Sequence, residues 1–357
     1  MHDDHFIKLI CGQALIGNRY SSMEPISTKG NFSVLFQACD ESNGSIVAMK
    51  FFNPYKKDDD YRLKSFHREA QLLVDLKDNR RVIDMIEGLS THSITLKDTT
   101  TEIEIQNDYE YFVLELANTD IQAYIYEHET DALHKLITFK ELCKGVFSLH
   151  RKGICHRDLK PDNFLVLKNG DIKVSDLGTA ITLNGSTPLA TEYLMPVGDC
   201  RYSAPELFCG VGIRDSSAFA SDIFSLGCIL FEMFTKTLLT GKVYNKELVK
   251  DLFDLHNHLS VASPSNRNFI FDETIDTVIT PHRLPDIYAY NEEIPKCIRL
   301  NLNKLYQEMV NLNYRRRNIN HLSIIRQLDI CIIVLRNQQK DQFIKRCKRL
   351  LRESKSC

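Results

Sequence analysis

The sequence predicts an α+β protein in which a small part, rich in antiparallel strands and carrying one helix, precedes a larger and mainly helical part. Two observations predict this. Short runs of β-branched and aromatic residues dominate the first 116 residues, whereas apolar residues at three- and four-residue intervals dominate the rest. The length of 357 residues fits two domains, or one domain of two lobes.

The β-rich part opens with two strand-like runs, residues 34–38 and 46–52, joined by the turn 40–44. Such a turn between two short apolar runs is typical of an antiparallel hairpin. Residues 61–77 place apolar side chains at helical spacing, which predicts an amphipathic helix. Further strands are expected at residues 93–96, 102–105 and 109–116.

In the helical part, residues 139–150 and 220–234 predict buried helices. Between them, the runs 164–167 and 172–174 predict a second small hairpin. The sequence therefore divides into an N-terminal extension (1–19), a β-rich lobe (20–116), a helical lobe (117–320) and a helical basic tail (321–357). The extension carries no signal that indicates a role.

Chemistry concentrates in one loop, His156-Arg-Asp-Leu-Lys-Pro-Asp-Asn163. Transfer of a γ-phosphoryl group needs a carboxylate near the incoming hydroxyl, a cation near the transferred group and oxygen ligands for Mg²⁺. Asp158 can orient and deprotonate the hydroxyl, and Lys160 can neutralise the growing charge. Asn163 offers an oxygen to a metal ion.

A second motif, Ser175-Asp-Leu-Gly178, follows the expected strand 172–174. An aspartate at a strand end, followed by a glycine that permits a sharp turn, suits a metal held between phosphates. Together the two motifs resemble those of the Hanks-type serine/threonine protein kinases over residues 20–235. The resemblance implies a bilobal kinase fold that uses ATP and Mg²⁺ to phosphorylate serine or threonine on protein substrates, with Asp176 and Asn163 as metal ligands.

The resemblance also assigns residues in the β-rich lobe. Val47-Ala-Met-Lys50 resembles the third-strand motif, so Lys50 is expected to hold the α- and β-phosphates and to pair with Glu69. Leu114 is expected at the back of the adenine pocket, and Glu115 to Ala117 as the hinge. The nucleotide-contacting residues implied are Gly30, Ala48, Lys50, Leu114, Glu115, Ala117, Asp120 and Leu165.

Three scaffold features follow from the same resemblance. Gly198 to Glu206 resembles the end of a kinase activation segment, and Arg317 is the expected ion-pair partner of Glu206. Asp222 is expected to hold the backbone of the catalytic loop. Arg157 in kinases often receives a phosphate from the activation segment, which predicts autophosphorylation at one of the hydroxyls of Thr179, Thr182, Ser186, Thr187, Thr191 and Tyr193.

The sequence departs from the family at two places. Of the glycine-rich loop, only Gly30 remains in Thr28-Lys-Gly-Asn-Phe-Ser-Val-Leu35. Asp199 stands where serine/threonine kinases usually carry threonine; its carboxylate could pair with Lys160 but would crowd Asp158 with like charge. These departures leave open a pseudokinase that binds nucleotide as a scaffold. A small-molecule kinase on the same fold is a further alternative, disfavoured by the Ala-Pro-Glu ending at Glu206.

The remaining features concern partners and location. Residues 342–352 predict a basic amphipathic helix, which could bind an acidic or anionic partner or pack on the helical lobe. The net charge of -2 gives no global attraction to nucleic acid or membrane. The apolar stretch 223–234 is short for a bilayer, so we expect no transmembrane segment. The unpaired spacing of the 11 cysteines and the acidic N-terminus favour a cytoplasmic protein with reduced thiols.

Overall fold

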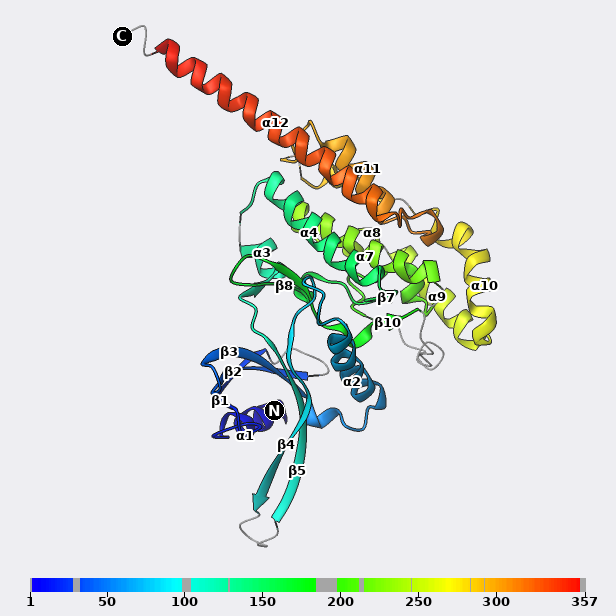
Figure 1. The fold of residues 1–357 in the computed structure, drawn as a ribbon. Helices are drawn as coiled ribbons and strands as arrows, with labels where there is room; N and C mark the ends of the chain where they lie inside the picture. Colours follow the sequence, from blue (N-terminus) through cyan, green and yellow to red (C-terminus); the bar gives the residue numbers. More distant parts are fainter. Residues whose placement is uncertain are drawn as a thin grey trace. The chain divides into compact units, whose positions relative to one another are not determined.

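The chain folds into two compact units. The N-terminal unit comprises Met1–Asp120 and Phe164–Thr179, and the C-terminal unit comprises Ile121–Asn163 and Ala180–Cys357. The computed structural model describes residues 2–27, 33–97, 104–127, 129–183, 198–211, 215–244, 246–282, 284–291 and 293–353 (Figure 1).

A five-stranded antiparallel sheet forms the centre of the N-terminal unit, in the order β1-β2-β3-β5-β4. Its strands are β1 (Tyr20–Ser27), β2 (Ser33–Asp40), β3 (Ser45–Phe52), β4 (Met85–Lys97) and β5 (Glu104–Glu115). The hairpin expected from residues 34–52 is confirmed, and its turn places Gly44 at a φ of 72°. The strand expected at 93–96 is only the end of β4, because β4 and β5 extend together as a long hairpin.

Two helices accompany this sheet. Helix α2 (Asp60–Asp75) confirms the expected amphipathic helix, and the Asp59 side chain caps it by accepting from the backbone N–H of Arg62. Helix α1 (His2–Cys11) packs against β1, and its Phe6 and Ile10 are buried in the same apolar cluster as Phe36 of the sheet. The first residues of the chain therefore contribute to the core of the N-terminal unit.

A smaller sheet, in the order β6-β8-β9, completes the N-terminal unit. It consists of β6 (Thr119–Asp120), β8 (Phe164–Val166) and β9 (Ile172–Val174), so the second expected hairpin is confirmed. Val174 exchanges backbone hydrogen bonds with the segment before β4: its N–H donates to Arg81 O, and its carbonyl accepts from Ile83. These bonds fix the end of β9, from which the Ser175–Gly178 motif continues into the short 3₁₀ helix η3 (Leu177–Thr179).

The C-terminal unit is mainly helical. Helix α7 (Asp215–Thr235) lies at its centre and packs against α4 (Ala132–His150) and α11 (Arg299–Met309) (Figure 1). The window Ala218–Thr235 includes the stretch 223–234 and is long and apolar enough to cross a membrane by length and composition alone. Because 89% of that window is buried inside the protein, its composition is explained by a core helix.

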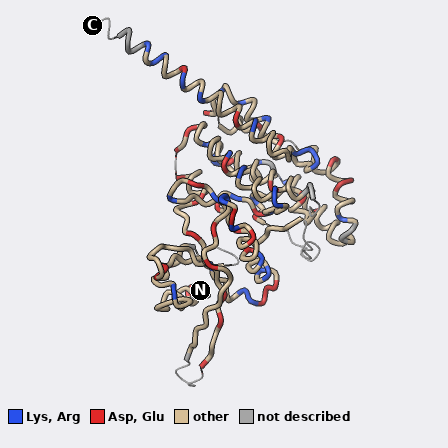
Figure 2. The backbone as a smooth tube through the Cα atoms, viewed as in Figure 1, with Lys and Arg blue, Asp and Glu red and all other residues tan. Residues whose placement is uncertain are grey.

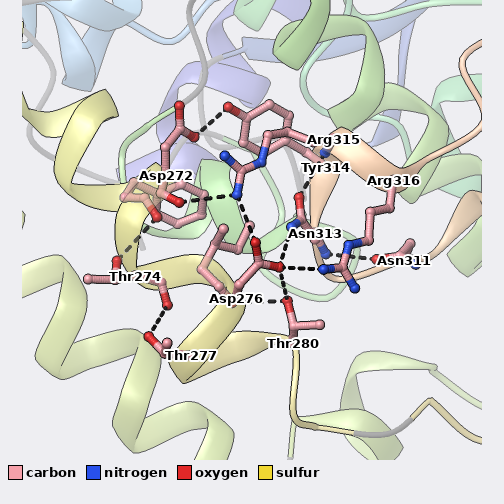
Figure 3. A network of polar contacts seen from close by, with 12 residues as sticks. Asp272, Thr274, Asp276, Thr277, Thr280, Asn311, Asn313, Tyr314, Arg315 and Arg316 are labelled. Atoms are coloured by element: carbon pink, nitrogen blue, oxygen red, sulfur yellow. Dashed lines mark hydrogen bonds and ion pairs between the residues drawn. The ribbon is translucent and has the colours of Figure 1, made fainter.

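The described residues between α7 and α11 include a run of helices. After the four-residue helices α6 (Pro205–Phe208) and α8 (Thr240–Val243), the chain forms α9 (Lys246–Val261), α10 (Pro264–Thr274) and the π-helix η4 (Ile275–Ile279). The carboxylate of Asp276 accepts from Asn313, Arg315 and Arg316, and Tyr314 donates to Asp272 (Figure 3). This network ties the segment before Arg317 to α10 and η4.

The final helix, α12 (His321–Glu353), is 33 residues long. Its first half packs against α4 and α11 and buries Ile324, Leu328, Cys331 and Leu335. From Arg336 to Arg346 every residue is exposed, including Phe343 at 68%. Lysines and arginines recur along this far half (Figure 2). The basic amphipathic segment is therefore part of a longer helix whose far half projects beyond α11 (Figure 1).

Candidate active site

Three charged side chains meet inside the N-terminal unit. The ammonium of Lys50 on β3 lies 2.8 and 2.7 Å from the two carboxylate oxygens of Glu69 on α2, and 3.1 Å from Oδ1 of Asp176. The expected Lys50–Glu69 pair is thus present, with both side chains buried. Burial alone would lower the pKa of Lys50, but the carboxylates of Asp176 and Glu69 outweigh it and raise the pKa above its ordinary value.

Asp176 owes its position to the backbone at the end of β9. Its φ is 59°, in the left-handed region that aspartate tolerates better than most residues, and its side chain is 39% exposed. The positive φ at this turn belongs to Asp176, and Gly178 lies in the 3₁₀ helix η3 that follows. The side chain consequently presents one oxygen to Lys50 while part of the carboxylate remains accessible.

Most of the expected nucleotide-contacting residues lie on strands of the two sheets of the N-terminal unit. Ala48 on β3 pairs with Leu114 on β5, and both are nearly buried. In the smaller sheet Asp120 pairs with Leu165. Ala117 follows β5 in an irregular segment and is half-buried. Gly30, the one remaining glycine of the expected loop, lies outside the described residues.

The side chain of Glu115 has a partner that the sequence did not predict. Lys173 on β9 is nearly buried and contacts Glu115 and Asp84, the latter at 2.7 Å. The backbone N–H of Asp84 also donates to Glu115, at 2.8 Å. Because one cation holds two carboxylates, the end of β5 is tied to β9 and to the residue before β4.

The catalytic-loop residues Asp158, Lys160 and Asn163 lie together in the C-terminal unit. The ammonium of Lys160 is 3.4 Å from Oδ2 of Asp158, and Asn163 donates its side-chain N–H to the Asp158 carbonyl at 2.7 Å. Asn163 ends the 3₁₀ helix η2 (Pro161–Asn163), which brings it back to the aspartate. The three side chains therefore share one short turn of chain.

Asp222 on α7 anchors this loop, as expected. Its carboxylate accepts from the backbone N–H groups of His156 and Arg157, both at 2.8 Å, and contacts Nε2 of His150 at 2.8 Å. Burial would raise the pKa of Asp222, but these interactions outweigh it and lower the pKa. His150 also lies 3.1 Å from His321 at the start of α12, a contact that the sequence did not indicate.

Asp199 has a partner that its sequence position did not suggest. Its carboxylate is engaged by Arg201 through Nε at 3.0 Å and Nη2 at 2.6 Å, and by the Arg201 backbone N–H at 2.9 Å. Its own backbone N–H donates to Oδ1 of Asp158 at 2.7 Å. The sequence carried a signal for this ion pair, because a carboxylate and a guanidinium stand two residues apart in a short loop.

The buried ion pair expected between Glu206 and Arg317 is confirmed. Both side chains are fully buried, and Arg317 contacts both carboxylate oxygens of Glu206. The guanidinium also donates to backbone carbonyls, including Asn311 O at 2.6 Å, and lies over the ring of Phe224. This pair joins the end of the activation segment to the chain before α12.

Comparison with known proteins identifies the family to which these features belong. A model of the protein kinase domain matches residues 23–328. The chain belongs to the protein kinase family. This membership confirms the fold class read from the sequence, with a five-stranded antiparallel sheet and α2 followed by a mainly helical part.

Relatives of this kinase include serine/threonine and mitogen-activated protein kinases. The mitogen-activated protein kinase HOG1 of Scheffersomyces stipitis is 28% identical over 296 residues, covering 79% of this chain and 66% of the relative. Mitogen-activated protein kinase 18 of Arabidopsis thaliana is 33% identical over 70% of this chain and 39% of its own length. A probable serine/threonine-protein kinase of Clostridium perfringens is 27% identical over 62% of this chain. The chain spans only 29 to 66% of the length of these relatives.

The expected metal ligands offer oxygen atoms, which suit Mg²⁺. No cluster of three or more histidine, cysteine, aspartate or glutamate side chains able to hold a metal ion occurs among the described residues. Mg²⁺ usually takes one or two protein oxygens and completes its shell with phosphates and water. Of the two expected metal ligands, Asp176 lies in the N-terminal unit and Asn163 in the C-terminal unit. The described cysteines are all free thiols.

Proposed function

We propose that the protein transfers the γ-phosphoryl group of Mg·ATP to serine or threonine hydroxyls of protein substrates. The observation that carries this proposal is the buried Lys50–Glu69 ion pair with Asp176 beside it, in a chain of the protein kinase family. Pseudokinases usually lose at least one of these charged residues, and here all of them are in place.

In this proposal the N-terminal unit binds the nucleotide. Ala48 and Leu165 enclose the adenine ring, Leu114 lies behind it, and the backbone of Glu115 to Ala117 bonds the base. Asp120 contacts the ribose, and Lys50, held by Glu69, bonds the α- and β-phosphates. Gly30 belongs to the loop that covers the phosphates. The Lys173–Glu115 contact supports this assignment because it steadies the backbone that would bond the base.

The C-terminal unit acts on the acceptor hydroxyl. Asp158 orients the hydroxyl and accepts its proton, and Lys160 neutralises charge on the transferred group. Asp222 supports this role because it fixes the backbone from which Asp158 projects. Asn163 of this unit and Asp176 of the N-terminal unit are each proposed as a ligand of Mg²⁺, which would supply charge neutralisation at the phosphates.

Phosphate transfer from radiolabelled Mg·ATP to the protein itself and to a basic protein substrate tests the proposal. The variant Asp158→Asn should lose at least about 100-fold in rate, because the proton acceptor is gone while the size of the side chain is kept. Asp171→Asn, which alters an exposed carboxylate in the turn between β8 and β9, serves as the matched control and should transfer at the parent rate. ATP binding without transfer by the parent protein would contradict the proposal and favour a pseudokinase.

We also propose autophosphorylation within the activation segment, supported by Arg157 in the catalytic loop. Thr179 lies in η3 and is buried, and Thr182 lies in β10 (Ile181–Thr182). The other expected acceptors, Ser186, Thr187, Thr191 and Tyr193, lie outside the described residues. Mass mapping after incubation with Mg·ATP should find phosphate between residues 176 and 206 in the parent and none in Asp158→Asn. Phosphate found only elsewhere in the chain would contradict this part.

The far half of α12 is proposed to bind an acidic or anionic partner. Lys345, Arg346 and Lys348 are exposed there beside the exposed Phe343. Replacement of these three basic residues with glutamine should weaken retention on immobilised heparin. The matched control replaces three exposed lysines elsewhere in the C-terminal unit, Lys246, Lys250 and Lys296. Equal losses of retention in both variants would contradict a specific role for α12.

A further inference from the structure

The segment that begins at Gly198 lies directly against the catalytic loop. Gly198 has a φ of 84°, and a Cβ on it would lie 2.4 Å from the carbonyl oxygen of Arg157 and 3.2 Å from Oδ1 of Asp158. The backbone N–H of Asp199 donates to the same Oδ1 at 2.7 Å. The side chain at position 199 therefore starts beside the carboxylate that acts on the acceptor hydroxyl.

A second carboxylate at this place poses an electrostatic problem. Like charges a few ångströms apart repel, and the repulsion is strong where little water separates them. The side chains of Asp158 and Asp199 are only 12% and 17% exposed. An unpaired Asp199 would push Asp158 out of position or compete with it for the ammonium of Lys160.

Arg201 removes this problem. Its guanidinium bonds the carboxylate of Asp199 through two nitrogens, Nε and Nη2, in the side-on geometry that suits arginine and a carboxylate. Burial would raise the pKa of Asp199, but the bonds from Arg201 outweigh it and lower the pKa. The guanidinium carbon of Arg201 lies over the ring of Tyr202, 5.7 Å from its centre, and the Tyr202 hydroxyl donates to buried Glu232 at 2.6 Å.

We propose that Arg201 is a positioning residue for phosphoryl transfer, which holds and neutralises the carboxylate of Asp199 so that Asp158 keeps its orientation toward the acceptor hydroxyl. This inference rests on the proposed function. In this chain an ion pair between residues 199 and 201 replaces the threonine expected at position 199. The two residues form a unit, because Asp199 is tolerated beside Asp158 only while Arg201 holds it.

Steady-state kinetics of the full chain, with Mg·ATP and myelin basic protein as the probe, test this dependence. Arg201→Gln should lower kcat about 10- to 100-fold and leave the KM for ATP within about twofold, because small displacements of a reacting group cost rates of this order. The double variant Asp199→Thr, Arg201→Gln should recover to within about threefold of Asp199→Thr alone. Arg201→Lys, which keeps the charge without the two-nitrogen geometry, should lie between Arg201→Gln and the parent.

Two kinetic outcomes would overturn the proposal. In one, Arg201→Gln transfers phosphate at the parent rate. In the other, the double variant is as slow as Arg201→Gln, which would mean that Arg201 acts on the substrate or the fold without Asp199.

A second measurement needs no activity. Thermal unfolding is compared for Arg201→Gln in the parent and in the Asp158→Asn background, where the amide oxygen can still accept from Asp199 but the negative charge is gone. The loss in Tm should be at least about 2 °C larger in the parent, since repulsion exists only there. Equal losses in both backgrounds would refute the role assigned to Arg201. The loss in Tm could be larger in the parent while the parent transfers no phosphate. In that case the proposed function fails, and the electrostatic dependence between Arg201 and Asp158 stands.

Discussion

Removal of Arg317 should destabilise the C-terminal unit more than any exposed charge substitution. In Arg317→Met, the fully buried carboxylate of Glu206 keeps the hydroxyl of Ser221, which donates at 2.7 Å, but loses both bonds from the guanidinium. Leaving one charge of a buried pair unmatched costs about 3–5 kcal/mol. The carbonyls of Asn311 and Ala220 also lose a donor, so the free energy of unfolding should fall by about 5 kcal/mol.

Far-UV circular dichroism during heating measures this effect, since the chain contains no tryptophan for fluorescence. At roughly 2–4 °C per kcal/mol, the unfolding of the C-terminal unit should shift down by about 10–20 °C. Adding Glu206→Leu should restore at least half of the loss, because a buried pair replaced by apolar side chains is often neutral. Arg315→Met, which breaks an exposed pair with Asp276, should cost no more than about 1 kcal/mol. A double variant as unstable as Arg317→Met would refute this reasoning.

Three further predictions concern separate parts of the chain. Lys50→Met should keep the fold but lower kcat/KM for phosphate transfer by about 100-fold or more, since the ammonium that the structure places between two carboxylates is lost; a transfer assay that shows parent activity would contradict it. Burial and the neighbouring His150 lower the pKa of His321 to about 4, below its unfolded value near 6.5. The unfolded state therefore binds more protons between these values, and the free energy of unfolding should fall as the pH drops from about 6.5 to 4, by about 1–2 kcal/mol after allowance for solvent screening. His321→Asn should flatten this dependence in urea titrations, and an unchanged slope would contradict the assignment. Phe6→Ala should destabilise the N-terminal unit by about 3–5 kcal/mol, measured by hydrogen exchange of β2 and β3; a cost below about 1 kcal/mol would show that α1 is dispensable.

Features encoded by contiguous residues were predictable from the sequence. The hairpin of β2 and β3 and the helix α2 follow from local periodicity and turn residues. The catalytic loop keeps Asp158, Lys160 and Asn163 within six positions, so their proximity follows from chain geometry. The long-range pairs Lys50–Glu69 and Glu206–Arg317 were predictable only through the resemblance to kinases, because nothing local connects their partners.

Features that depend on packing could not be read from the sequence. Helix α1 is ten residues long, and an isolated helix of that length is marginal in water; the apolar cluster around Phe6 stabilises it. The direction in which Asp199 turns is decided by Arg201 and by the backbone bond to Asp158, and residue type alone does not fix it. The contact of His150 with His321 joins positions 171 residues apart. Such pairs are set by the tertiary fold.

The place of α1 has a practical consequence for producing this kinase. The family match begins at residue 23, so a shortened protein could be designed to start there. A protein begun there would lack Phe6, Ile10 and Ile16, all of which are buried in the parent. The apolar face of the sheet that they cover would then meet water, and exposed apolar patches of this kind promote self-association. Poor solubility of such a truncated protein would reflect a missing part of the core.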